Sequence, residues 1–304
     1  MVEYPPPGRM LDVGGRRLHL QESGQGSPVV VLEAGIAATS LSWRTVQKEI
    51  ARFTRVISYD RAGLGWSDAA MARPTTVPLV DDLRALLRSA EAPPPYILVG
   101  HSFGALIVRA YAGRYPDEVA GIALVDPLRP EEWYPLSEQQ GRTLERGVRL
   151  SRRGAMLARI GLVGWCLRSL LAGSRWLPKA VGGAASGRGL SVMKRLAGEV
   201  GKMPQEVWPM VAAHWSSPKS FLGMAAHLES LPRSAQELYD APPLDGIPAI
   251  VLCSVRSTAP APERLSADVR CIVAEKSGHW IHLDQPELVV DAVRDLIRNV
   301  GTSQ

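Results

Sequence analysis

Four short runs of continuously apolar residues constrain the fold of this chain more than any other feature. Strands buried on both faces have this pattern, as in a parallel sheet that helices cover on either side. The runs span residues 28–33, 55–59, 96–100 and 119–125. Segments with helical periodicity lie between them, at 41–51, 77–90 and 103–115. This alternation predicts right-handed βαβ units and an α/β fold with a doubly wound sheet.

The pattern extends in both directions along the chain. Residues 9–13 and 16–20 alternate around Gly14-Gly15, which predicts an antiparallel hairpin. Apolar runs return at 247–253 and 269–274, and a helix is predicted over 286–299, with a proline in its first turn. We therefore expect a mostly parallel eight-stranded sheet.

The alternation stops between residues 127 and 240. Five of the eight tryptophans lie there, no convincing strand is visible, and residues 182–189 are Gly-rich, typical of a flexible connection. We predict an inserted helical cap over residues 127–240, with residues 1–126 and 241–304 forming one core domain.

Charge is concentrated in this predicted cap. Residues 141–202 hold thirteen Lys and Arg against two acidic residues, a net charge of +11, so the remainder carries −6. This basic segment could rest against an anionic membrane, or it could be a solvated face. We favour the solvated face, since Arg159 and Arg168 fall roughly 180° apart on a helical wheel.

Composition excludes several classes of protein. At 304 residues and 46% apolar residues, the chain is not disordered. The longest apolar stretch, 154–173, contains Arg159 and Arg168 and is a poor membrane span. The first residues have neither a basic start nor an apolar core, so we expect a cytoplasmic protein.

We expect no cofactor, no metal and no nucleic-acid partner; the oligomeric state stays open. The three cysteines are widely spaced and odd in number, which argues against a disulfide framework or a zinc site. The Gly-rich segment 60–68 has neither a Gly-Lys-Ser/Thr nor a G-x-G-x-x-G motif, so nucleotide binding is not indicated.

The motif with the clearest chemistry is Gly100–Gly104, which reads G-H-S-F-G. It follows a predicted strand and opens a predicted helix, the context of a nucleophile elbow. Small residues around the turn let the chain pass closely, so the Ser102 hydroxyl would stand exposed at the carboxyl edge of the sheet.

A serine nucleophile needs a base and an acid that orients the base. His279 follows the last predicted strand and would reach the same sheet edge as Ser102. The other histidines lie in the elbow itself, the hairpin or the cap, or fit a structural role better: His101, His19, His214, His227 and His282.

The acid is less obvious, because residues 254–258 contain no carboxylate after the penultimate strand. Asp126 ends the preceding strand, and parallel strands end at one edge. We therefore predict Asp126, with Asp284, Glu275 and Glu263 as alternatives. The oxyanion would need two backbone N–H donors, and we predict those of Phe103 and Ile36.

These motifs resemble the capped, single-domain α/β hydrolases over about 190 residues, everything but the predicted cap. The matching segments include 32–35 with Trp43, 60–67, 99–104, 115–119, 124–127 and 277–280. The missing carboxylate after the penultimate strand resembles members that place the acid one strand earlier. We expect Gly35, Trp43 and His101 to contact the substrate.

The resemblance alone does not choose an activity. Dehalogenases and epoxide hydrolases of this fold use an aspartate nucleophile, which Ser102 argues against. We predict hydrolysis of carboxylic esters, with hydrophobic acyl or lipid-like groups, through an acyl-enzyme. Carbon–carbon bond hydrolysis, acyl transfer, perhydrolysis and a non-catalytic receptor are the alternatives.

Overall fold

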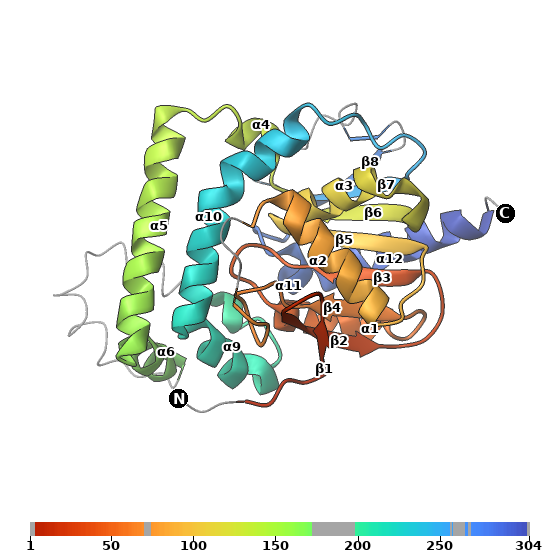
Figure 1. Ribbon diagram of the computed structural model, residues 1–304. Coiled ribbons are helices and arrows are strands. Elements are labelled where there is room, and N and C mark those ends of the chain that lie inside the picture. Colours follow the sequence, from red (N-terminus) through yellow and green to blue (C-terminus); the bar gives the residue numbers. More distant parts are fainter. Residues whose placement is uncertain are drawn as a thin grey trace.

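A computed structural model describes residues 4–69, 74–171, 198–255, 257, 265–266 and 269–302. One eight-stranded sheet forms its centre (Figure 1). The strands are, in spatial order, β1 (Arg9–Asp12), β2 (Arg17–Ser23), β4 (Val56–Tyr59), β3 (Val29–Glu33), β5 (Tyr96–His101), β6 (Val119–Val125), β7 (Ala249–Ser254) and β8 (Val269–Ala274). Only β2 runs antiparallel to its neighbours β1 and β4, so the predicted mostly parallel sheet is confirmed.

The continuously apolar strands are explained by burial on both faces. In β3, Val29 and Val31 join one hydrophobic cluster, and Val30 and Leu32 join the other. The first cluster includes α2 (Thr76–Ser89) and α3 (Gly104–Arg114); the second includes α1 (Arg44–Ile50) and α12 (Pro286–Thr302). Two short helices add buried residues to the core, η1 (Ser40–Trp43) and α11 (Ile281–Asp284), while η2 (Pro116–Glu118) precedes β6 and buries none.

Between β6 and β7 the described residues form helices and no strand. These are α4 (Pro130–Trp133), α5 (Glu138–Arg159), α6 (Leu162–Leu171), η3 (Gln205–Val207), α9 (Trp208–Trp215) and α10 (Pro218–Tyr239). Figure 1 shows α10 beside the sheet and α5 on the far side of α10. The cap boundaries at 126/127 and 240/241 stay predictions, and Trp176 and the Gly-rich connection at 182–189 lie outside the described residues.

The helix break after α5 overturns one sequence argument. Gly161 has φ +76°, a left-handed conformation that glycine adopts without steric cost, and α6 starts at the next residue. Arg159 and Arg168 therefore lie on two different helices, and placing them on one helical wheel was wrong.

None of the helices in the described ranges is long and apolar enough to cross a membrane.

Candidate active site

The turn between β5 and α3 holds Ser102 in a strained conformation. Its φ is +53°, in the left-handed region that non-glycine residues rarely occupy. The chain also passes very close to β3: a Cβ on Gly104 would lie 2.5 Å from the Glu33 carbonyl oxygen. A glycine is therefore required at position 104 for the elbow to form as it does.

A chain of hydrogen bonds joins the three residues predicted as a triad. The Ser102 hydroxyl lies 3.0 Å from His279 Nε2, and His279 Nδ1 lies 2.6 Å from Asp126 Oδ2. With Nδ1–H donating to the carboxylate, Nε2 is left to accept the serine proton. The three side chains come from the β5–α3 turn, the end of β6 and the β8–α11 loop, so the sheet edge brings them together.

The loop after β7 supports Asp126, although it carries no carboxylate among its described residues. The Ser254 N–H donates to Asp126 Oδ1 at 2.9 Å, and the Ser257 hydroxyl donates to the same oxygen. Neither contact was predicted from the sequence. Ser254 donates through its backbone N–H, which every residue except proline has, so its side chain gave no signal.

The carboxylates considered as alternatives to Asp126 differ from it in their surroundings. Asp284 accepts hydrogen bonds from the Gly278 N–H and the Ser277 hydroxyl, and it pairs with Lys202 at 2.7 Å. It therefore shapes the loop that carries His279 without contacting the imidazole. Glu275 is exposed, and Glu263 lies outside the described residues.

Asp126 stays ionised over the whole range in which proteins are usually assayed. Burial raises its pKa, but hydrogen bonds from His279, Ser254 and Ser257 outweigh burial and lower the pKa to about 2. In the unfolded chain the pKa of an aspartate is about 3.9. The native state therefore favours the carboxylate, which accepts the hydrogen bond of His279 Nδ1–H.

This shift predicts a measurable effect on acid stability. A pKa lowered by folding contributes stability that is present above about pH 4 and is lost as pH falls toward about 2. Asp126→Asn should therefore flatten the decline in the free energy of unfolding across that window. Urea unfolding from pH 5 to pH 2 checks this, and an unchanged slope would show that Asp126 is not selectively stabilised as the anion.

The two backbone amides predicted to bind an oxyanion lie in turns beside Ser102. Phe103 directly follows Ser102 and precedes the first residue of α3, and Ile36 lies in the turn after β3. Neither N–H has a hydrogen-bond acceptor among the described residues. Both remain available to donate to a substrate oxygen.

A buried arginine holds the turn that carries Ile36. Arg61 donates to the carbonyl oxygens of Ala34 and Gly35, and it pairs with Glu33. Its Nε also donates to His227 Nε2 of α10 at 3.3 Å. Burial and the Arg61 charge lower the pKa of His227 to about 3, so this imidazole is neutral and can accept. The network thus connects the turn after β3 to α10.

Removing this arginine should be costly. Arg61→Met leaves the Glu33 carboxylate buried without its counter-charge, and we expect the free energy of unfolding to fall by about 3–5 kcal/mol. Urea denaturation measures the loss. The double variant Glu33→Gln/Arg61→Met should lose less than the sum of the single changes, while Arg52→Met, which breaks an exposed pair with Glu49, should barely matter. Additive losses would contradict the pairing.

The residues predicted to contact substrate have different surroundings. Gly35 lies against Ser102, because a Cβ there would sit 3.4 Å from Ser102 Cβ. Trp43 is fully buried, with its ring 4.3 Å from that of His282. His101 is also buried, and its Nε2 lies 2.9 Å from the His279 carbonyl oxygen. The structure thus lends no support to substrate contact by Trp43 or His101, and His101 instead anchors the backbone of His279.

The other histidines considered as the base have contacts with residues other than Ser102. His19 contacts Asp60 through Nδ1 at 2.8 Å, the ring of His214 lies 4.2 Å from that of Trp66, and His227 belongs to the Arg61 network. His282 is fully buried between aromatic rings. His279 is the histidine that the structure places beside Ser102.

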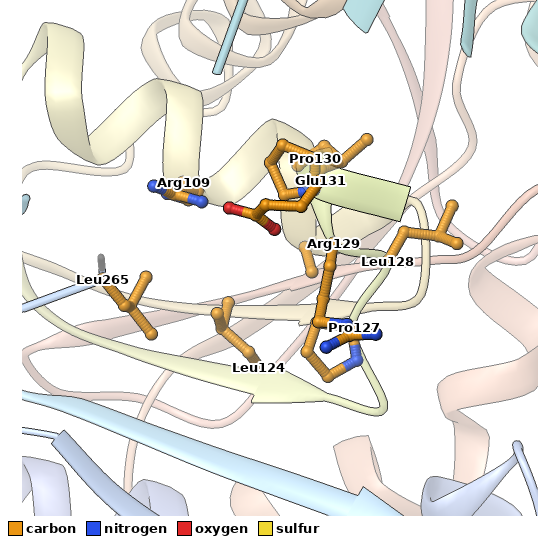
Figure 2. A pocket seen from close by; sticks show the side chains of 10 residues that line it. Arg109, Leu124, Pro127, Leu128, Arg129, Pro130, Glu131 and Leu265 are labelled. Carbon is orange, nitrogen blue, oxygen red and sulfur yellow. The ribbon is translucent and has the colours of Figure 1, made fainter. Parts of the chain in front are cut away.

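A small cavity lies behind the elbow, between α3 and the segment that follows Asp126 (Figure 2). Its volume of about 20 Å³ has room for one water molecule and is too small for an ester. Figure 2 shows the Glu131 carboxylate pointing toward the Arg109 guanidinium above this cavity. Neither Ser102 nor His279 lines it, so it is separate from the reacting groups.

The part of the chain that the structure describes contains no cluster of three or more His, Cys, Asp or Glu residues suited to a metal ion. The expectation that the protein needs no cofactor stays a prediction.

Comparisons with known proteins agree with the fold. Residues 28–151 match the family model described as alpha/beta hydrolase fold. A 2-hydroxy-6-oxo-2,4-heptadienoate hydrolase from Pseudomonas putida is 34% identical over 126 residues, which cover 39% of this chain and 44% of that protein. The chain spans less than half the length of the curated relatives it matches.

Solved structures match over nearly the whole chain. An epoxide hydrolase superposes with a TM-score of 0.71 at 19% identity, covering 96% of this chain and 98% of the other. An esterase from Thermogutta terrifontis superposes with a TM-score of 0.58 at 23% identity, covering 94% of each chain. With the strand order and the matched family model, these likenesses show that the chain has the α/β-hydrolase fold.

Proposed function

We propose that this protein is a serine hydrolase that cleaves carboxylic esters through an acyl-enzyme. The observation that carries the proposal is the continuous hydrogen-bond chain from Ser102 through His279 to Asp126. A serine hydroxyl is a weak nucleophile at neutral pH, and the His279 Nε2 atom, 3.0 Å from its oxygen, is placed to act as the base that it needs.

In the first half-reaction, His279 Nε2 takes the Ser102 proton as the serine oxygen attacks the ester carbonyl. The negative charge that develops on the carbonyl oxygen is stabilised by the amides of Ile36 and Phe103. The Asp126 carboxylate stabilises the imidazolium at Nδ1. The imidazolium then protonates the leaving alcohol, and the acyl group stays on Ser102.

In the second half-reaction, His279 takes a proton from a water molecule, which attacks the acyl carbonyl. The same two amides stabilise the second oxyanion. When this intermediate collapses, His279 returns the proton to Ser102 and the carboxylic acid leaves. The protein is thus restored with every proton accounted for.

Hydrolysis of carbon–carbon bonds is the second candidate, favoured by the similarity to the Pseudomonas putida dienoate hydrolase. The same serine and histidine could act on an activated ketone. Epoxide hydrolysis and dehalogenation fit less well, because a serine occupies the nucleophile position.

A substrate panel separates these functions. We expect p-nitrophenyl esters of graded acyl length to be hydrolysed, with no turnover by Ser102→Ala. A 2-hydroxy-6-oxo-dienoate assayed beside them tests the second candidate. Turnover of the dienoate without turnover of any ester would overturn the ester proposal.

A further inference from the structure

The outer side of α5 combines basic and apolar residues in an unusual way. At 100° per residue, seven exposed positions between residues 146 and 160, in α5 and its C-cap, fall within an arc of about 120°. We define this outer face as Arg146, Arg149, Leu150, Arg153, Met156, Leu157 and Ile160. The opposite side packs on α10, where Gly147 and Gly154 let Leu228 and Phe221 approach. The outer face thus lies on the layer farthest from the sheet (Figure 1).

The apolar residues of this face are strongly exposed. Ile160, Met156 and Leu150 expose 75%, 66% and 64% of their surface. Two residues after α5 ends, α6 adds Leu162 and Trp165, which are also exposed. Six of the ten large hydrophobic side chains that the described residues expose lie between positions 150 and 165. A purely solvated face gives no reason for this concentration.

Within the described part of the chain, the arginines of the face form no ion pairs. Arg142 and Arg152 of the same helix pair with Glu138 and Glu229. By contrast, Arg146, Arg149 and Arg153 have no acidic partner among the described residues, and neither does Arg159 at the end of the helix. The exposed Glu145 is the acidic residue beside them. The face therefore carries a clear positive charge around its apolar side chains.

We propose that this face docks the protein on an anionic lipid surface. A helix lying in the membrane interface buries apolar side chains at the level of the headgroups while its cations contact anionic lipids. The outer face offers both groups on one convex helix. Docking would place α5 against the lipid, with α10 between α5 and the sheet edge that holds Ser102. The inference does not depend on the proposed ester hydrolysis.

Vesicle co-sedimentation tests the proposal. We expect the full chain to sediment with vesicles of phosphatidylcholine and phosphatidylglycerol at low salt. It should stay in solution with pure phosphatidylcholine, and 0.5 M NaCl should release it, because salt screens exposed charges. Ser102→Ala should bind like the parent, which separates docking from catalysis.

Matched variants locate the surface. Arg149→Gln/Arg153→Gln should weaken binding at least tenfold, since each cation near such a surface contributes roughly fivefold. Arg44→Gln/Arg88→Gln removes the same charge from exposed positions of α1 and α2 and should change binding little. Met156→Ser/Ile160→Ser should also weaken binding, while Val77→Ser, at an exposed position of α2, should not.

Three results would overturn the proposal. They are no sedimentation with anionic vesicles, equal losses in the two arginine pairs, and self-association that disappears in Met156→Ser/Ile160→Ser without vesicle binding by the parent. The last result would identify a second copy of the chain as the occupant. Thermal unfolding of each variant confirms that these exposed substitutions leave the fold intact.

Discussion

Alanine in place of Ser102 or His279 should lower kcat for ester hydrolysis by at least about 10³, with the fold unchanged. Without the serine no acyl-enzyme forms, and without the imidazole nothing takes the serine proton. The two residues act as one unit, joined by a 3.0 Å hydrogen bond, so the double variant should lose little more than either single variant. Steady-state kinetics on the best ester of the panel measure these losses.

A covalent probe tests directly whether Ser102 is the nucleophile. A fluorophosphonate should add one adduct to the parent protein at Ser102, located by mass spectrometry, and none to Ser102→Ala. Ser89→Ala changes an exposed serine on α2 and should keep the parent rate. More than a tenth of the parent rate in Ser102→Ala would mean that another residue is the nucleophile.

Asp126→Asn should lower kcat by about 10² to 10⁴. Asparagine can donate from its amide to His279 Nδ1, which would favour the imidazole tautomer with the proton on Nε2. That tautomer cannot accept the serine proton. The loss in kcat should come with a lower thermal midpoint above pH 5, because the extra stability of the buried carboxylate is lost there, although Ser254 and Ser257 can still donate to the amide oxygen.

Carboxylates elsewhere supply the controls for Asp126. Glu275→Gln removes an exposed charge three residues before Gly278 and should be nearly silent. Glu263→Gln should also be silent. A large loss in Glu263→Gln with a small loss in Asp126→Asn would show that the acid comes from the loop after β7, and that the contact between His279 and Asp126 is structural.

Much of the sheet edge that holds Ser102, Asp126 and His279 can be predicted from local sequence patterns. The elbow at Ser102 can be predicted from the sequence because its geometry requires small neighbouring residues, above all Gly104. A predicted strand and a predicted helix on either side support it. The parallel strands can also be predicted from local sequence, because strands buried on both faces are apolar at every position. Parallel strands also end at one edge, which is why Asp126 and His279 could be placed near Ser102 before their contacts were known.

Contacts between segments that are distant in the chain could not be predicted from the sequence. Ser254 and Ser257 donate to Asp126 from more than a hundred residues away, His101 anchors the His279 backbone, and Arg61 reaches across to α10. A serine, histidine or arginine has the same local preferences whether or not such a partner exists, so periodicity and spacing carry no trace of these bonds.

The outer face of α5 shows most clearly the difference between what the sequence pattern predicts and what packing determines. The order of residues shows that residues 141–202 are strongly basic, and it predicts the alternation of strands with helices and the sharp turn at Ser102. The folded structure is needed to see which arginines share a surface with exposed apolar residues. This is because α5 ends before Gly161 and α6 begins after it, while α10 covers one side of α5, so packing selects which side chains stay in water.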